Sequence, residues 1–318
     1  MSEESIRTTA ELIRHADAVL VGAGSGLSSA AGYNHYHRNA VFEANFHDFE
    51  EAYGIQSLFH GFYYIYSKPE QQWGFYSRYI KFMEDAPAGQ PYIDLVEILK
   101  DKEYFILTTN CDIQIPKVFP EDRICQFQGD FRYFQCSQPC HDKLYESHDL
   151  VSAMLDNMEG LEVPAEWIPR CPECGWKMVP WVQDNTFLQG EAWQTAYQRY
   201  EDFVRKYQGK KLLLLELGVG EMTPSIIKLP FWELTAKNEN VFYACLNREA
   251  SHSPEHLRGR SLYLQGDLAE TLAALRQARS IAVTIIGNCE TKNIISVDNY
   301  FIFQRSYKLC EVLNKNNY

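Results

Sequence analysis

The sequence contains no long apolar run and no excess of basic residues. Its longest apolar stretch, Leu212–Leu217, has the length of a strand, whereas a membrane-spanning helix needs about 20 apolar residues. Residues 1–16 also lack the apolar core of a signal peptide. The 318 residues carry a formal net charge of −12, which disfavours a nucleic-acid partner because phosphate binding requires a basic surface. We therefore expect a cytoplasmic protein that binds neither nucleic acid nor membrane.

Cysteine occurs nine times, an odd number that disfavours a disulfide framework where no export signal is present. Four of the nine form a C-x3-C and a C-x2-C pair, and two such knuckles supply the tetrahedral sulfur site that Zn²⁺ prefers. Four sulfur ligands leave no open position, so we predict one structural zinc ion. Unrelated free thiols and a redox pair are the alternatives, but a redox C-x2-C should open a helix after a strand. The predicted ligands are Cys136, Cys140, Cys171 and Cys174, with His141 expected at the surface and not as a ligand.

A strand and a glycine turn follow a first helix near Ile6–Ala16. Residues Ala18–Val21 form a short buried strand, and Gly22-Ala23-Gly24 comes directly after it. Small residues in 22–32 let backbone N–H groups approach a pyrophosphate at a helix N-terminus. The spacing departs from G-x-G-x-x-G because Leu27 stands where the third glycine belongs. A glycine turn that only packs a helix on the sheet is the alternative.

Further short apolar runs end in polar or glycine residues and are typical of buried strands. Their alternation with helices predicts a Rossmann-like, doubly wound α/β fold with a mostly parallel sheet. The predicted elements are strands Tyr104–Leu107, Leu212–Leu217, Val241–Leu246 and Ser261–Leu264, a helix Leu268–Ala278, and an amphipathic run Tyr300–Leu313 without assigned chemistry.

The chain divides into four predicted parts. No repeat, low-complexity tract or linker separates independent domains. The parts are a Rossmann-like nucleotide-binding domain (1–32, 92–131 and 183–287), a helical aromatic-rich insert (33–91), a zinc-binding module (132–182) and a C-terminal extension (288–318).

Polar side chains follow the strand Tyr104–Leu107. Thr109, Asn110 and Asp112 stand just past its carboxyl end, where open α/β sheets bind ligands. Asn110 and Asp112 are two positions apart and point the same way if the segment is extended. An Asx-type turn in which Asp112 caps a helix is the alternative.

The order of these motifs resembles that of the sirtuins. Sirtuins carry a Gly-Ala-Gly loop, a T-Q-N-x-D segment, an H-G pair, two cysteine knuckles, a G-T-S strand end, an Asn at the next strand tip and a G-D pair. The resemblance spans roughly residues 18–278. Each motif alone is weak evidence for the family, but the whole series in this order is specific to it. The corresponding segments are Gly22-Ala23-Gly24, Thr108–Asp112, Phe127-Gln128-Gly129, the cysteine pairs, Leu217-Gly218-Val219-Gly220, Asn247 and Gly266-Asp267.

The resemblance implies NAD as a substrate and assigns roles within the series. Asp112 would contact the nicotinamide carboxamide or its ribose, and Asn110 would hold the ribose or a water beneath it. Asn247 would contact the adenosine ribose, and Asp267 would lie near the adenine. The implied catalytic residues are Asn110, Asp112 and Gln128, and the implied cofactor-binding residues are Gly22, Ala23, Gly24, Ser28, Gly32, Thr109, Gly218, Gly220, Asn247 and Asp267.

Two departures from the sirtuin pattern bear on the reaction. Gln128 stands where sirtuins have their catalytic histidine, and Tyr33–Tyr36 replaces a Pro-Asp-Phe-Arg stretch, with Arg38 the nearest replacement for the missing charge. This combination is similar to the macrodomain-linked, class M sirtuins of microbes, which are associated with protein ADP-ribosylation. The similarity implies an acceptor protein, a lipoylated carrier resembling the glycine-cleavage H protein, and a macrodomain hydrolase on a separate chain.

The Gln128 amide favours transfer over deacylation for a chemical reason. A sirtuin deacylase needs a base at a ribose hydroxyl, and a primary amide has no basic nitrogen. Transfer to Asp or Glu needs no base, because a carboxylate of pKa ~4 is already ionised at neutral pH. We therefore predict an NAD-dependent protein ADP-ribosyltransferase in which Gln128 positions the ribose hydroxyls. His35 and His37 are the nearest substitutes for a base, but we expect them to pack within the aromatic insert.

Four other functions remain as alternatives. An NAD glycohydrolase would use the same residues with water as acceptor, and a deacylase would need a relocated base. A catalytically silent NAD or ADP-ribose sensor has less need of Asn110 and Asp112. An oxidoreductase needs an acidic residue about 20 positions past the glycine loop, and Glu43 stands there with no strand before it. Cys111, inside the proposed site, is expected to be a small buried side chain without a catalytic role.

Overall fold

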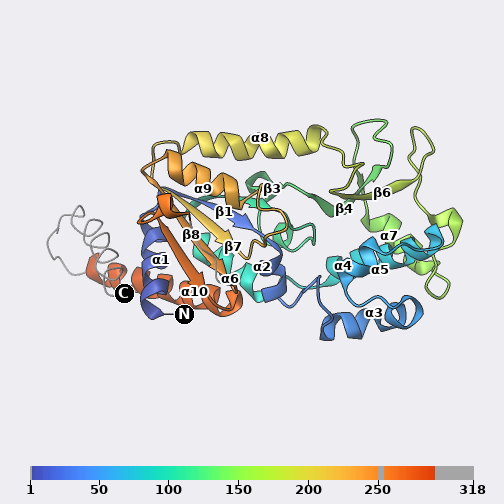
Figure 1. The fold of residues 1–318 in the computed structure, drawn as a ribbon, viewed down its shortest axis with the longest axis horizontal. Coiled ribbons are helices and arrows are strands. Elements are labelled where there is room, and N and C mark those ends of the chain that lie inside the picture. Colours follow the sequence, from blue (N-terminus) through green and yellow to red (C-terminus); the bar gives the residue numbers. More distant parts are fainter. Residues whose placement is uncertain (1, 250–253, 291–318) are drawn as a thin grey trace.

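The computed structural model describes residues 2–249 and 254–290 (Figure 1). The predicted extension 288–318, with its amphipathic run Tyr300–Leu313, lies outside the described residues except for positions 288–290. In the described ranges, no helix combines the length and the apolar content that a membrane span requires. The division of the chain into four parts stays a prediction.

The central sheet contains six strands: β1 (Ala18–Ala23), β2 (Glu103–Thr108), β3 (Ile124–Gln126), β7 (Leu212–Leu217), β8 (Val241–Asn247) and β9 (Ser261–Gln265). They lie in the order β3-β2-β1-β7-β8-β9, and all neighbouring pairs are parallel. This is the 3-2-1-4-5-6 order of the Rossmann fold. Because the inner strands are buried on both faces, their sequences are continuous apolar runs.

Helices cover both faces of this sheet (Figure 1). One face packs against α1 (Glu3–His15), α6 (Gln90–Leu99) and α10 (Leu268–Glu290). The other face packs against α8 (Glu191–Lys206) and α9 (Lys228–Lys237). The short helix α2 (Ser25–Ala30) follows β1 directly. The predicted doubly wound α/β fold is confirmed.

A second, largely aromatic layer lies at the end of the molecule remote from α1 (Figure 1). Its helices are α3 (Ala40–Tyr53), α4 (Leu58–Tyr63), α5 (Pro69–Asp85) and α7 (His148–Asp156). Its antiparallel sheet, in the order β5-β4-β6, contains β4 (Gly129–Cys136), β5 (Tyr145–Glu146) and β6 (Met178–Val182). Aromatic rings fill its core, where the Phe46 ring lies 5.4 Å from Phe75 and 5.8 Å from Phe42. Such ring pairs add to the free energy gained by burial alone.

The predicted strands and the helices predicted near Ile6–Ala16 and at Leu268–Ala278 are confirmed, most of them with shifted ends. β7 has its predicted bounds, but β1 continues two residues past Val21 because Gly22 and Ala23 pair with both neighbouring strands. The glycine turn therefore begins at Gly24. The short edge strand β3 was not predicted, since three residues carry no pattern.

Candidate active site

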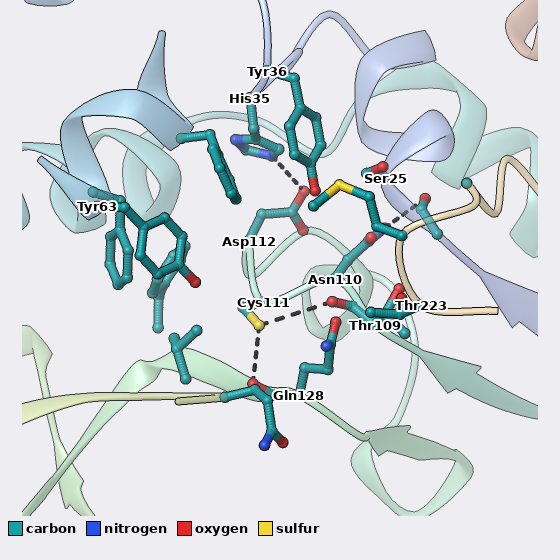
Figure 2. Close-up of a pocket in the computed structure, with 18 of the residues that line it drawn as sticks. Ser25, His35, Tyr36, Tyr63, Thr109, Asn110, Cys111, Asp112, Gln128 and Thr223 are labelled. Atoms are coloured by element: carbon teal, nitrogen blue, oxygen red, sulfur yellow. Dashed lines mark hydrogen bonds and ion pairs between the residues drawn. The ribbon is translucent and has the colours of Figure 1, made fainter. Parts of the chain in front are cut away.

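The carboxyl ends of β1, β2 and β7 meet where the strand order reverses, and open α/β sheets bind ligands at this point. A cavity of about 400 Å³ lies there, between polar loops of the sheet and rings of the aromatic layer (Figure 2). The structure thus brings six of the predicted site residues together. These are Gly24, Thr109, Asn110, Asp112, Gln128 and Gly220.

Asn110 is fixed by contacts with the turn after β1. Its backbone N–H donates to the Thr108 hydroxyl oxygen at 3.0 Å, and that hydroxyl donates to the Ala23 carbonyl. The side-chain Nδ2 donates to the Gly24 carbonyl at 3.0 Å. One N–H of the Asn110 amide is therefore used within the protein, and only 8% of the residue is exposed.

Asp112 is the buried carboxylate of the cavity, with 3% of its surface exposed. Its Oδ2 accepts a hydrogen bond from the Ser28 hydroxyl and lies 3.1 Å from His35 Nε2. Its Oδ1 accepts from the Gln114 backbone N–H at 3.3 Å, so the Asx-type turn is present together with the side-chain contacts. Burial raises the pKa of Asp112, but the hydrogen bonds and charge around it outweigh burial, and the pKa lies below its ordinary value. The group is therefore ionised and only accepts hydrogen bonds.

Gln128 reaches the cavity from the turn between β3 and β4. Its backbone oxygen accepts from the Gln183 N–H at 2.9 Å and from the Cys111 thiol at 3.3 Å. The next residue, Gly129, has a φ of 95°, and a Cβ there would lie 2.0 Å from the Trp181 backbone oxygen. Only glycine adopts this backbone at so close an approach. The position of Gln128 is thus set by the backbone on both sides.

Cys111 was predicted to be a small buried side chain, and it is more exposed than that. It is half-buried and lines the cavity between Asn110 and Asp112. Burial, with the charges of Asp130 and Asp112, raises the pKa of its thiol well above the ordinary value. A thiol that stays protonated is a weak nucleophile. The absence of a catalytic role stays a prediction.

Gly22 and Ala23 lie within β1 and do not line the cavity. A Cβ on Gly22 would lie 2.3 Å from Ile227 and 2.8 Å from Phe231, so this glycine lets α9 pack closely on the sheet. That is the packing role considered above as the alternative to a phosphate cradle. Gly24 is the N-cap of α2 and lines the cavity.

Two further predicted residues do not line the cavity but lie next to residues that do. Gly218, with a φ of 59°, packs directly on the backbone of Gly26. Asn247 donates from Nδ2 to the carbonyl of Val219, a lining residue, at 3.0 Å. Both residues therefore position the loop after β7 and do not themselves border the cavity.

Asp267 and Gly32 do not line the cavity. Asp267 accepts hydrogen bonds from the backbone N–H groups of Ala269 and Glu270 and so caps the N-terminus of α10. Gly32 follows α2 with a φ of 94° and open space around it. Their predicted contacts with NAD stay predictions.

His35 is a lining residue that sequence reasoning left out of the site. It contacts Asp112 across 77 positions of sequence, a separation that no local pattern reveals. His37, in contrast, is exposed. Arg38 was considered as a replacement charge, but it pairs with Glu50 at 2.8 Å and Glu43 at 3.2 Å and does not line the cavity.

The mouth of the cavity is apolar and partly exposed. Tyr36, Phe59, Tyr63 and Met222 line it and are 38%, 37%, 53% and 71% exposed. The Phe59 ring lies 5.0 Å from Tyr36 and 4.8 Å from Tyr63, so the rings form one surface. Contiguous exposed apolar surface is typical of a binding site. We refer to these four residues as the apolar mouth.

The four predicted zinc ligands converge at the end of β4 opposite to Gln128. The Sγ atoms of Cys136 and Cys174 are 3.6 Å apart, those of Cys140 and Cys171 are 3.7 Å apart, and all four lie within 4.8 Å of one another. Tetrahedral Zn–S bonds of about 2.3 Å place sulfurs ~3.8 Å apart. The donor set and its spacing therefore fit Zn²⁺.

His141 differs from the prediction of a surface residue. It is half-buried, and its Nε2 lies 3.2 Å from Cys171 Sγ. An imidazole N–H beside a ligating thiolate stabilises the charge on that sulfur. The histidine thus supports the cysteine cluster from outside its four sulfurs.

Comparison with curated proteins found two relatives. No protein-family model matches the chain. Over 304 residues it is 32% identical to a protein ADP-ribosyltransferase of Staphylococcus aureus, with 92% of each chain covered. Over 290 residues it is 28% identical to a probable bifunctional ADP-ribose hydrolase/ADP-ribosyltransferase of Fusarium oxysporum, with 85% of this chain and 47% of that protein covered. The chain thus spans about half of the Fusarium protein.

Solved structures of Sir2 proteins share the fold. A Sir2 complex with a peptide and NAD⁺ superposes with a TM-score of 0.57 at 16% identity, covering 87% of this chain and 99% of that one. An ADP-ribose complex of a mutant Sir2 homologue gives a TM-score of 0.56 at 16% identity, covering 89% and 98%. The fold and the full-length similarity to the Staphylococcus protein agree, and this chain belongs to the family of sirtuin-like protein ADP-ribosyltransferases.

Proposed function

We propose that this protein cleaves the nicotinamide–ribose bond of NAD and transfers ADP-ribose to a carboxylate of an acceptor protein. The C1′–N bond breaks with its electron pair on the nicotinamide nitrogen, and a carboxylate oxygen forms the new bond to C1′. No proton has to move, because the acceptor is already ionised. The observation that carries this proposal is an amide, Gln128, beside Asn110 and Asp112 at the cavity, where sirtuins have a histidine.

The cavity suits a reaction in which positive charge develops on the ribose. Its lining includes the ionised Asp112 and, among the described residues, no lysine or arginine. A negative charge placed where positive charge develops lowers the barrier. Asn110, whose Nδ2 donates one hydrogen bond to Gly24, would accept a hydrogen bond from a ribose hydroxyl or a water through Oδ1. Gln128 would hold the ribose hydroxyls.

The contacts of His35 support transfer over deacylation. It is the one histidine that lines the cavity in the described part of the chain. Both its ring nitrogens are engaged, Nε2 with Asp112 at 3.1 Å and Nδ1 with the Tyr79 hydroxyl at 2.8 Å. To deprotonate a ribose hydroxyl, this ring would first have to give up one of these contacts. Among the described residues, no second histidine lines the cavity to serve as the base of the deacylase reaction.

We propose a lipoylated carrier protein resembling the glycine-cleavage H protein as the acceptor. The apolar mouth supports this choice, because the aliphatic arm of a lipoyl group would pack on exposed aromatic and methionine side chains. The name of the Fusarium relative joins a hydrolase to a transferase. For this protein we propose that the hydrolase which removes ADP-ribose is a separate macrodomain protein.

Gln128 variants test the proposal. Wild type should show negligible deacetylation of acetyl-lysine peptides with NAD, and its transfer rate should lack a pH limb near pKa ~6.5 unless the acceptor brings one. Gln128→Ala should slow transfer by about 5- to 150-fold, the effect of ~1–3 kcal/mol of lost hydrogen bonding. Gln183→Ala, at the same rim of the cavity, is the matched control. Deacylation by wild type that His35→Ala abolishes and Gln128→Ala spares would replace the transferase with a deacylase.

A further inference from the structure

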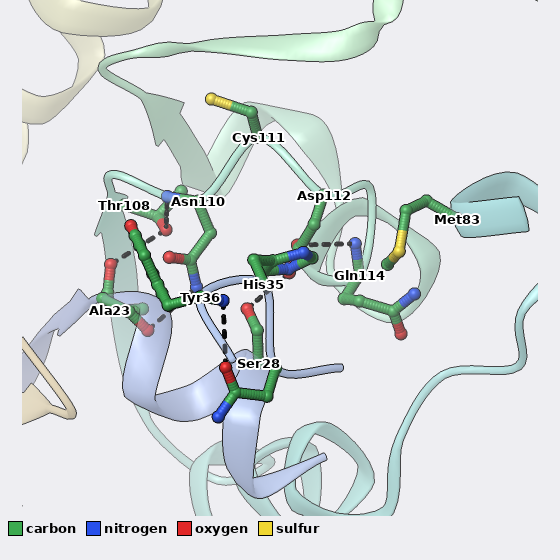
Figure 3. Close-up of polar contacts among 12 residues, drawn as sticks. Ala23, Ser28, His35, Tyr36, Met83, Thr108, Asn110, Cys111, Asp112 and Gln114 are labelled. Carbon is green, nitrogen blue, oxygen red and sulfur yellow. Dashed lines mark hydrogen bonds and ion pairs between the residues drawn. The ribbon is translucent and has the colours of Figure 1, made fainter. Parts of the chain in front are cut away.

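Two of the three residues proposed to act on NAD are held through their own side chains. The Asn110 amide donates to the Gly24 carbonyl at 3.0 Å. The Asp112 carboxylate accepts a hydrogen bond from Ser28 (Figure 3). Gln128 differs, because its side-chain amide makes no hydrogen bond within the described part of the chain, where only its backbone is bonded. The direction of the Gln128 amide therefore depends on the backbone that carries it.

A buried ion pair lies two residues beyond Gln128. Asp130, on β4, is fully buried and does not line the cavity. Its Oδ2 lies 2.7 Å from Arg132 Nε and 2.6 Å from Arg132 Nη2, and its Oδ1 accepts from the Arg132 backbone N–H at 2.9 Å. Burial raises the pKa of Asp130, and the adjoining guanidinium opposes that rise. The carboxylate thus holds both the side chain and the backbone of Arg132.

Arg132 extends this pair to both sides of β3. Its Nη2 donates to Gln126 Oε1 at 3.3 Å, and its Nη1 pairs with Glu121. Gln126 is the last residue of β3, and Glu121 begins the short 3-10 helix that leads into the strand. A guanidinium presents its donors in a rigid fork, so one side chain can join several acceptors. The start of β4 is therefore tied to an edge strand of the central sheet.

The ion pair lies where the regular pairing of β4 is interrupted. Asp130 pairs with Trp181 of β6. The next pair joins Phe134 to the neighbouring Pro180, so residues 131–133 have no partner on β6. Such a bulge bends its strand and changes the direction of the side chains beside it. The Arg132 N–H lies in this bulge and bonds to Asp130, so the ion pair fixes the backbone where the ladder to β6 does not.

The two anchored positions, Gln126 and Asp130, are separated by only three residues, and Gln128 is the middle one. We propose that Asp130 and Arg132 are positioning residues that hold this turn so that the Gln128 amide faces the ribose of NAD. A displacement of about 1 Å at a reacting group can slow a reaction by up to ~100-fold. The inference rests on the proposed function, in which Gln128 holds the ribose hydroxyls.

A double-mutant cycle with Gln128→Ala tests this inference. Asp130→Asn keeps the size of the side chain and removes the charge that holds Arg132. At saturating NAD, with the carrier protein present, it should slow nicotinamide release about tenfold, because a misdirected amide is lost chiefly from the transition state. Its dissociation constant for NAD, measured by calorimetry, should change by less than about threefold. In the Gln128→Ala background, which has no amide to direct, the same substitution should change the rate by less than about twofold.

Two further variants separate positioning from a general effect on the fold. Arg132→Lys keeps a positive charge beside Asp130 but loses the fork of donors, so it should fold and slow release about threefold, again only where Gln128 is present. Asp94→Asn is the matched control. Asp94, on α6, is 1% exposed, lies 3.3 Å from the Arg276 guanidinium on α10 and does not line the cavity. Its loss should leave the rate of nicotinamide release unchanged.

The dependence on Gln128 decides between positioning and structure. If Asp130→Asn and Arg132→Lys slow release by the same factors with and without the Gln128 amide, their role is structural and the inference is overturned. Wild-type rates for both variants would overturn it as well. If release obeys the cycle but no ADP-ribose reaches a protein, the proposed transfer fails while the inference stands.

Discussion

Gly24 and Gly220 both line the cavity, but only one of them has room for a methyl group. A Cβ on Gly24 would lie 2.7 Å from the Val219 Cα and 2.8 Å from the Gly218 carbonyl oxygen, both of them backbone atoms that cannot rotate away. A Cβ on Gly220 would meet nothing within 4 Å. Alanine substitution at the two positions therefore adds the same atoms to the same cavity with opposite steric outcomes.

The expected effect of Gly24→Ala follows from these distances. Ordinary carbon contacts lie at about 3.5–4.0 Å, so the turn must move by ~1 Å. That shift strains the hydrogen bonds from the Gly24 N–H to Leu217 and from the Gly26 N–H to Gly218, which are 3.0 and 2.9 Å long. Overpacking costs about 1–3 kcal/mol, and each weakened hydrogen bond adds up to ~1 kcal/mol. We expect a loss of about 2–4 kcal/mol for Gly24→Ala and a change within ~1 kcal/mol for Gly220→Ala.

Urea unfolding and NAD binding measured by calorimetry check this pair. Gly24→Ala should unfold at lower urea and bind NAD at least tenfold more weakly, because the turn it displaces borders the cavity. Gly220→Ala should unfold like wild type. Equal stability and equal NAD affinity for the two variants would refute the close approach of the turn after β1 to the loop after β7.

Two further predictions concern the cysteine cluster and a buried carboxylate. Protein purified without chelator should hold about one zinc per chain, and Cys174→Ser should lower metal content, stability and, indirectly, activity; metal content near zero would contradict this. Glu216 is fully buried beside Tyr243, with Lys228 3.9 Å away. Burial raises its pKa above the ordinary ~4.3, so its contribution to stability is present below that value and lost as pH rises through the folded-state pKa. The glutamine of Glu216→Gln is uncharged at every pH, so in urea unfolding this variant should become more stable relative to wild type as pH rises from about 4. A difference in unfolding free energy between the two proteins that stays constant with pH would contradict the raised pKa of Glu216.

The strands of the central sheet could be predicted from sequence because the pattern that marks each strand lies within the strand itself. Parallel strands buried on both faces are continuous apolar runs, and Leu212–Leu217 has the bounds that this pattern predicts. Polar residues past strand ends likewise led to Asn110 and Asp112. β3 escaped prediction because it is too short for a pattern and forms only by pairing with β2.

The surroundings of the site depend on contacts between distant residues, which the sequence does not display. The aromatic composition around His35 favoured a packing role, and only the fold brings its ring to Asp112. Gly22 fits a phosphate loop in sequence, yet its space is taken by Ile227 and Phe231 of another segment. Sequence motifs thus located the cavity, and tertiary contacts decide which motif residues border it.

The central claim is that ADP-ribose leaves NAD for a protein. NAD labelled in its adenylate portion, incubated with the enzyme and a lipoylated carrier protein, reports both nicotinamide released and label bound to protein. We predict equal amounts of the two, and a strong reduction of both by Asn110→Ala, whose amide is fixed at the cavity. Nicotinamide release in full with no label on protein would identify a glycohydrolase and contradict the account.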